Sequence, residues 1–273
     1  MLLTRTLLGL AWGLAAGAAA AQDVVFADGF EPVTAMRMSD LALRDPHVYV
    51  NAIFSCADVT DTPLLGFSLN GTIRARIQTD EDGDGWLDAN FLQLYRPLTA
   101  GGSGPVAVTG GVCTAPMATT TCLRDPALTP QPRWYTTATS GTCLAAEPGS
   151  VRPYSPAVAA VDAPCLLSST QEMMLDLGGI AIPARASTFA GRFSGTPAVP
   201  AEGLLSAFVR EVDAEAVLLP ADLPLIGGQP LSSLLPGGTG NCAGHDDRDI
   251  LNGERGWWFH LNYSAAAVPW SEP

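Results

Sequence analysis

The residues with the clearest chemistry are five carboxylates within nine positions, in the segment Asp80-Glu81-Asp82-Gly83-Asp84-Gly85-Trp86-Leu87-Asp88. Acidic oxygens recur at alternate positions, which is the spacing a loop needs to wrap around one hard divalent cation. Glycines at the fourth and sixth positions permit the positive φ angles that let such a loop curl. Without a cation the carboxylates would repel one another. The sequence therefore predicts a structural Ca²⁺ site here.

The expected ligands are four aspartate carboxylates and one main-chain carbonyl, from Asp80, Asp82, Asp84, Asp88 and Trp86. In an EF-hand a glutamate at the twelfth loop position binds with both oxygens. The twelfth residue here is Phe91, so the EF-hand assignment fails. The alternative interpretation is a solvated acidic turn that binds no metal.

The same nine residues resemble the D-x-D-x-D-G-x-x-D hairpin loops of integrin-type β-propeller blades, and are similar to thrombospondin type 3 calcium repeats. The resemblance implies calcium ligation by the aspartates at the first, third, fifth and ninth positions. It also implies a loop between two strands, which we expect at residues 72–77 and 91–95. It does not imply a propeller, because the loop occurs once.

The elements that must hold this loop are predicted to be short β-strands. Polar and apolar residues alternate in 72–77, and the alternation in 256–264 gathers Trp257, Phe259, Leu261 and Tyr263 on one face. The 28 glycines and 22 prolines supply the many turns that short strands require. We therefore expect an all-β fold, a two-sheet antiparallel sandwich of jelly-roll type.

The six cysteines predict three disulfides, because an even number in an exported chain is typical of a disulfide framework. No C-x-x-C pair is present, which argues against a zinc ribbon. Proximity in sequence favours two of the pairs, and the third would join the two ends of the domain. The expected pairs are Cys113–Cys122, Cys143–Cys165 and Cys56–Cys242. Residues 113–165 are expected to form a loop-rich insertion that these bonds staple.

The amino-terminal residues predict export to the periplasm or the extracellular space. Arg5 precedes an apolar run that ends in an A-x-A cleavage site, so residues 1–21 are expected to be a signal peptide. The following F-A-D-G-F-E stretch resembles one found just after the signal in bacterial exported proteins. We expect residues 22–36 to be an extended leader and residues 37–270 to be a single domain.

Charge and motifs limit the function. A net charge of −13 argues against nucleic acid or anionic lipid as partner, and no second long apolar run predicts a membrane span. Neither a G-x-S-x-G elbow nor an H-E-x-x-H motif occurs, and no catalytic residue is assigned. Trp258, His260 and Asn262 share the second face of the last strand, a set that suits sugar binding because an indole stacks on a pyranose ring.

Two further histidine sites have less specific patterns. His47 begins a predicted strand, where a structural role is favoured over a catalytic one. The segment 245–249 is a second acidic cluster, which we interpret as a solvated turn in preference to a degenerate metal loop.

The expected function is that of an exported, calcium-stabilised and non-catalytic binding or structural module of the cell surface or periplasm. Its expected partner is a carbohydrate or a component of the cell surface. The alternative is a secreted hydrolase, acting on polysaccharide, in which the calcium loop only stabilises the fold.

Overall fold

The computed structural model describes residues 32–272 of the chain, except 53–54, 177–179, 222 and 224–225. The expected signal peptide at 1–21 and the expected leader up to residue 31 lie outside the described residues. The first strand begins at Thr34, within the segment predicted as leader.

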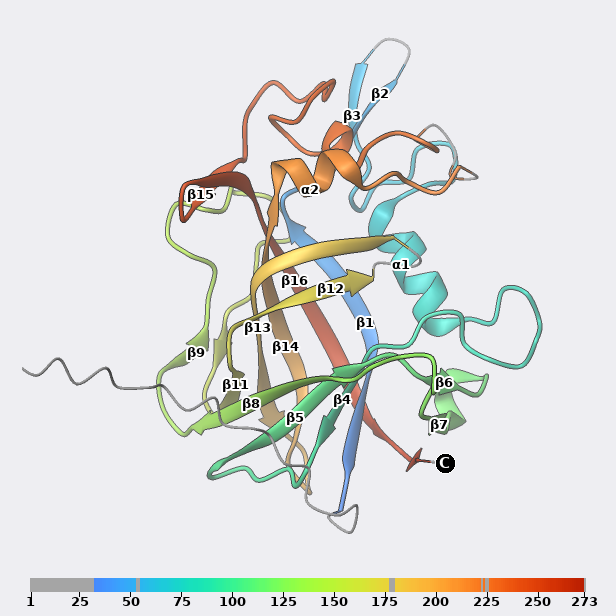
Figure 1. Cartoon of the computed structure of the whole chain (residues 1–273), viewed down its shortest axis with the longest axis vertical. Coiled ribbons are helices and arrows are strands. Elements are labelled where there is room, and N and C mark those ends of the chain that lie inside the picture. Colours follow the sequence, from blue (N-terminus) through green and yellow to red (C-terminus); the bar gives the residue numbers. More distant parts are fainter. Residues whose placement is uncertain (1–31, 53–54, 177–179, 222, 224–225, 273) are drawn as a thin grey trace, which may run out of the picture.

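Eight antiparallel strands form a closed β-barrel (Figure 1). In spatial order they are β1 (Thr34–Asp45), β4 (Leu92–Tyr95), β5 (Ser103–Thr109), β8 (Gln131–Ala138), β11 (Cys165–Ser168), β13 (Ala181–Ser194), β14 (Val199–Arg210) and β16 (Glu254–Val268). The barrel closes because β16 pairs with β14 along one edge and with β1 along the other.

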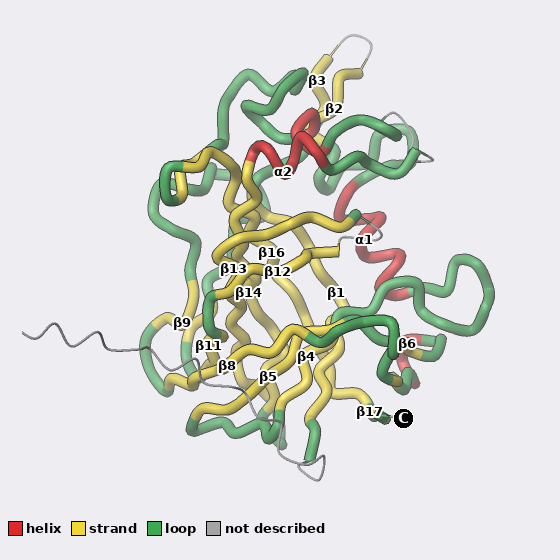
Figure 2. The backbone as a smooth tube through the Cα atoms, in the orientation of Figure 1, coloured by secondary structure: helices red, strands yellow, loops and turns green. Residues whose placement is uncertain are grey.

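The remaining elements are not among these eight strands. Within the described residues the helices and 3₁₀ turns are α1 (Leu69–Gln78), α2 (Glu211–Ala216), η1 (Met117–Thr119) and η2 (Leu231–Leu234). The additional strands are β2 (Tyr49–Ala52), β3 (Ser55–Asp58), β6 (Val112–Cys113), β7 (Cys122–Leu123), β9 (Thr142–Leu144), β10 (Val161–Asp162), β12 (Gln171–Asp176), β15 (Asp249–Leu251) and β17 (Trp270–Ser271). The β2–β3 hairpin and α2 lie together at one end of the barrel (Figure 2).

Side chains fill the barrel interior. The face of β16 that alternation assigned to the core is buried, with Trp257 and Leu261 at 0 % exposure. Tyr95 and Tyr135, from β4 and β8, meet edge to face with ring centroids 5.4 Å apart. These aromatic rings bury large apolar areas, which is the main stabilising term of such a core.

The expected two-sheet sandwich is wrong, because the sheet closes on itself. Alternation within a strand identifies its buried face in either architecture, so it does not distinguish a sandwich from a barrel. The distinction lies in the order of strands, and above all in the pairing of β1 with β16, which are far apart in sequence. The segment 113–165, expected to be a loop-rich insertion, contributes the barrel strand β8.

The strand expected at 72–77 is also wrong, since these residues belong to helix α1. Ile73 and Ile77 are both buried and stand four residues apart, the spacing of one helical face. The apparent alternation depended on Ala75, which is small enough to occupy either kind of element. The acidic loop is therefore preceded by a helix.

All three expected disulfides are confirmed: Cys56–Cys242, Cys113–Cys122 and Cys143–Cys165. Three disulfides indicate an oxidising, exported location. Of the helices in the described part of the chain, none has the length and apolarity needed to cross a membrane.

Candidate functional site

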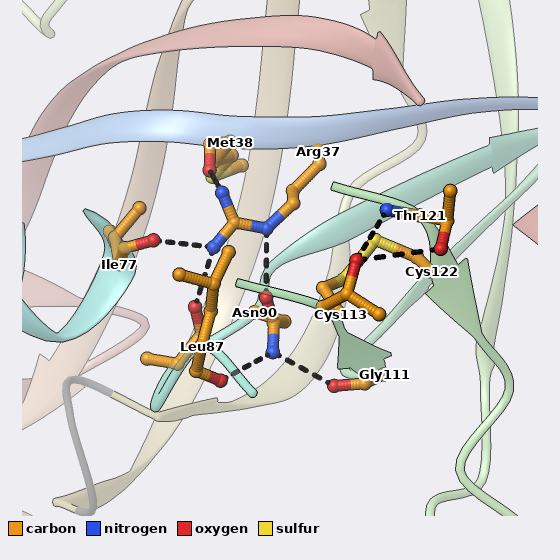
Figure 3. The surroundings of a disulfide bond; sticks show 11 residues. Arg37, Met38, Ile77, Leu87, Asn90, Gly111, Cys113, Thr121 and Cys122 are labelled. Atoms are coloured by element: carbon orange, nitrogen blue, oxygen red, sulfur yellow. Dashed lines mark hydrogen bonds between the residues drawn. A yellow bond between two sulfur atoms is a disulfide. The ribbon is translucent and has the colours of Figure 1, made fainter. Parts of the chain in front are cut away.

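The acidic loop is held on the barrel wall by a buried arginine. Arg37 of β1 is 2 % exposed, and its guanidinium donates to the Asn90 side chain at 2.8 Å and to the main-chain carbonyls of Ile77 and Ala89 (Figure 3). Ile77 lies near the end of α1, whereas Ala89 and Asn90 follow the loop. One side chain thus fixes both ends of the loop. Burial lowers the pKa of Arg37 to about 10, so it remains charged at neutral pH.

A disulfide-closed hairpin supports the second half of the loop. The Leu87 N–H donates to the Cys113 carbonyl at 2.9 Å, and the Ala115 N–H donates to the Gly85 carbonyl at 2.9 Å. Cys113 is bonded to Cys122 across β6 and β7 (Figure 3). Leu87 is 4 % exposed and packs into a cluster with the two cysteines. This packing fixes the point where the loop returns to the barrel.

The loop turns its first carboxylate inward. Asp80 Oδ1 accepts the Gly83 N–H at 2.7 Å, and Asp80 Oδ2 accepts the Gly85 N–H at 2.8 Å. Both glycines have positive φ, 76° and 92°. These main-chain donors, Gly85 foremost, lower the pKa of Asp80. The carboxylate is therefore ionised at neutral pH.

Three of the five predicted ligands lie together. Asp80, Asp82 and Asp88 each offer one carboxylate oxygen, and these oxygens lie within 4.8 Å of one another. Asp84 is outside the group, and its Oδ1 accepts the Trp86 N–H at 2.8 Å. The arrangement could hold a metal ion, whereas calcium ligation and the role of the Trp86 carbonyl remain predictions.

A groove of about 920 Å³ lies beside this loop. Its lining includes Asp82, Asp84 and Asp88 of the loop together with residues of β5, β8 and β12. A ligand in this groove would therefore lie against the acidic loop.

Of the predicted sugar-binding residues of β16, His260 is buried, whereas Trp258 and Asn262 are half-buried. His260 is 1 % exposed, and its Nδ1 lies 2.9 Å from the Ser206 hydroxyl. Burial lowers the pKa of His260 to about 4, so it is neutral at physiological pH. Asn262 exchanges two hydrogen bonds with the main chain of Ala159. Trp258 is half-buried and stacks near the His260 ring, 6.3 Å between centroids. These three residues thus contact the 150–160 segment or one another.

A second group of interacting polar side chains was not predicted from the sequence. We call it the polar cluster, and it lies at the end of the barrel where β1 finishes. Its members come from four segments of the chain: Asp45, His47, Tyr49, Asp58, Arg152, Tyr154, His245, Asp247 and Asp249.

Tyr154 is the centre of the polar cluster. Its ring stacks on His47 with centroids 3.8 Å apart, and its hydroxyl lies 2.8 Å from His245 Nε2 and donates to Asp247 Oδ2 at 2.5 Å. The Asp247 side chain is 2 % exposed and also pairs with Arg152. His47 Nδ1 lies 2.6 Å from Asp58 Oδ2. These contacts join the four segments to one another, although His47 Nε2 is buried without a hydrogen-bond partner.

Buried carboxylates dominate the electrostatics of the polar cluster. Asp45 is 2 % exposed, and burial raises its pKa to about 7, with the neighbouring Asp247 and Asp249 charges adding to the rise. Burial and Asp247 also raise the pKa of Asp249, whose Oδ2 is buried without a hydrogen-bond partner. Burial opposes ionisation of Asp58, but its hydrogen bonds from His47 and Thr60 outweigh that effect and lower its pKa.

Sequence patterns pointed to only part of this cluster. His47, for which a structural role is predicted, lies against Asp58. The segment 245–249 was interpreted as a solvated turn, but Asp247 is buried and paired. Nothing near Tyr154 in the sequence signalled that it would join the two. No family model, no curated protein and no solved structure matches this chain.

Proposed function

We propose that this protein is an exported, non-catalytic binding or structural module whose barrel is stabilised by Ca²⁺ at the Asp80–Asp88 loop. The observation that supports it best is the approach of three carboxylate oxygens within 4.8 Å, from Asp80, Asp82 and Asp88. Ca²⁺ takes oxygen ligands from carboxylates, carbonyls and water, and three converging carboxylates supply the charge that such a site requires. Its place of action is the periplasm or the extracellular space.

The anchoring of the loop explains how an ion would stabilise the whole fold. Arg37 and the β6–β7 hairpin connect the loop to barrel strand β1 and to the Cys113–Cys122 disulfide. Relief of carboxylate repulsion would therefore act on segments that close the barrel. Extracellular calcium modules bind with Kd of ~10⁻⁴–10⁻³ M. At about one hundred times Kd, ligand linkage adds ~2.7 kcal/mol to the free energy of unfolding.

A catalytic role for the polar cluster is less compatible with its contacts. The side chains of His47 and Asp247 are 6 % and 2 % exposed. An acid–base pair that hydrolyses polysaccharide must reach its substrate, whereas His47 is bonded to Asp58, and Asp247 to Tyr154 and Arg152. The proposal therefore assigns the cluster to the fastening of loops at the barrel end.

The test is thermal unfolding of the protein in chelator and in millimolar calcium. We expect calcium to raise Tm by roughly 5 °C, since about 1 kcal/mol shifts Tm by ~2–4 °C in a domain of this size. Asp82→Asn should lose most of this rise, whereas Glu81→Gln, which removes one charge from the same loop, should keep it. An equal rise in Asp82→Asn and in the unmodified protein would show that the loop is not the site.

A further inference from the structure

The barrel wall divides where β8 meets β11 and β12. β11 pairs with β8 from Cys165 to Ser168, and the Ser169 N–H still donates to the Trp134 carbonyl at 2.6 Å. Beyond this point the chain continues as β12, which among the described residues pairs with β13 alone. Figure 1 shows β12 and β8 diverging from here toward α1. One edge of β12 is therefore left without a neighbouring strand.

A buried arginine occupies the apex of this division. Arg133 of β8 is 1 % exposed and donates to the Ser169 carbonyl at 3.1 Å and to the Ser187 carbonyl at 2.7 Å. These contacts hold the start of β12 and the middle of β13 against β8. The division is thus a fixed feature of the packed core.

The groove beside the acidic loop occupies the division. Its lining includes Met173, Met174 and Leu175 of β12 together with Val108 of β5 and Gln131 of β8. Its volume is about 920 Å³, and the Met174 side chain is 50 % exposed. The unpaired main-chain N–H and C=O groups of a strand edge are where another strand can pair. An exposed apolar side chain beside them can contact that added strand.

The charges around the groove favour a basic occupant. Five carboxylates line it, from Glu81, Asp82, Asp84, Asp88 and Asp125, against the one guanidinium of Arg76. Calcium in the loop would offset two of these charges and leave the groove acidic. A basic segment would therefore be attracted in either state of the loop.

We propose that an extended peptide segment with basic side chains docks in this groove as an added strand on the unpaired edge of β12. This proposal rests on the function proposed above, because it names the partner of the proposed binding module. Strand addition supplies affinity through main-chain hydrogen bonds, and alternate side chains supply specificity. Here one face of the added strand would meet Met174 and its neighbours, and basic side chains would reach the carboxylates that line the groove.

The test is calorimetric titration of the full chain with a capped synthetic peptide of alternating valine and arginine. The matched probes are the same peptide with glutamate in place of arginine, and the arginine peptide with alternate amides N-methylated. We expect the arginine peptide to bind at least about tenfold more tightly than either control. Asp125→Asn should weaken its binding, whereas Glu147→Gln, at an exposed carboxylate outside the groove lining, should not.

Three outcomes would overturn the proposal: no binding of the arginine peptide, equal binding of the N-methylated peptide, or a dimer in solution whose contact covers β12. The last outcome would make a second copy the occupant. Each titration is run in chelator and in calcium, with Tm measured in parallel. Peptide binding without a calcium effect on Tm would remove the calcium proposal alone, and a calcium effect without peptide binding would remove this one alone.

Discussion

The acidic loop and the polar cluster both gather carboxylates, but they do so in opposite ways. In the loop the acids are neighbours in sequence, and Asp82 and Asp88 are exposed to solvent. In the polar cluster they come from distant segments, and Asp45 is buried. Water screens the repulsion between carboxylates in the loop. In the polar cluster burial removes that screening, and the repulsion is relieved by internal hydrogen bonds and by the raised pKa of Asp45.

The difference shows what each region requires from the rest of the molecule. The loop is shaped by its own glycines and held by Arg37, by the β6–β7 hairpin and by the Ala89 N–H, which donates to the Arg76 carbonyl at 2.9 Å. The cluster exists only if β1, the β2–β3 hairpin, the 152–154 segment and the 245–249 segment are all in place. The first region could hold an ion after folding, as proposed above, whereas the second is formed by folding itself.

Removal of the two disulfides that fasten these regions should have the largest effect. Cys56–Cys242 closes 186 residues and connects β3 to the segment before His245, whereas Cys113–Cys122 closes 9 residues beside the loop. Loop entropy gives about 5 kcal/mol for the first bond and about 2.5 kcal/mol for the second. We expect Cys56→Ala/Cys242→Ala to lower Tm by 10 °C or more, and Cys113→Ala/Cys122→Ala to lower it by about half as much.

The effect of calcium on Tm should also distinguish the two double variants. Cys113→Ala/Cys122→Ala should weaken the calcium effect on Tm, because the Cys113 carbonyl holds Leu87 at the end of the loop. Cys56→Ala/Cys242→Ala should keep that effect in full. The reverse pattern would mean that the loop depends on the distant end of the barrel, and the two regions would not be independent.

Asp45→Asn should have the next largest effect, and its sign depends on pH. The pKa of Asp45 is raised from 3.8 to about 7, so its contribution to stability is present below pH 4 and is lost as the pH rises through 7. Asparagine keeps an acceptor for the Arg152 N–H but does not ionise. The variant should match the unmodified protein near pH 4 and exceed its free energy of unfolding by up to about 4 kcal/mol at pH 8.

Urea unfolding at a series of pH values measures this difference. Asp40→Asn is the control, because Asp40 lies on the same strand and pairs with Arg74 at the surface. It should change stability little at any pH, as surface ion pairs contribute about 0–1 kcal/mol. If Asp45→Asn destabilises the protein at pH 8, then Asp45 is needed as a charge, and the account of the polar cluster is wrong.

What could be predicted from the sequence follows the same difference between local and distant contacts. The acidic loop, the core face of β16 and the three disulfides depended on nearby residues or on few alternatives, and the bonds and the core face are confirmed. The closure of the barrel and the polar cluster depended on pairings between distant segments, such as β1 with β16, which no local pattern encodes. Helix α1 was missed because Ile73 and Ile77 fit both periods, and Ala75 between them made the pattern resemble the alternation of a strand.

The smallest expected effect concerns the ligands within the loop. The sequence predicted both Asp84 and Asp88 as ligands. Only Asp88 is among the three residues whose carboxylate oxygens lie within 4.8 Å of one another. Asp84 instead accepts the Trp86 N–H, so it shapes the loop.

We expect Asp88→Asn to raise the Kd for calcium roughly tenfold or more, since affinity follows the number of charged ligands. Asp84→Asn retains an acceptor for that N–H and should raise it by about threefold or less. Calorimetric titration of chelator-treated protein measures both constants. An Asp84→Asn variant as weak as Asp88→Asn would show that the ion draws Asp84 into its coordination shell, and that the loop, like the polar cluster, takes its final arrangement only when all its partners are present.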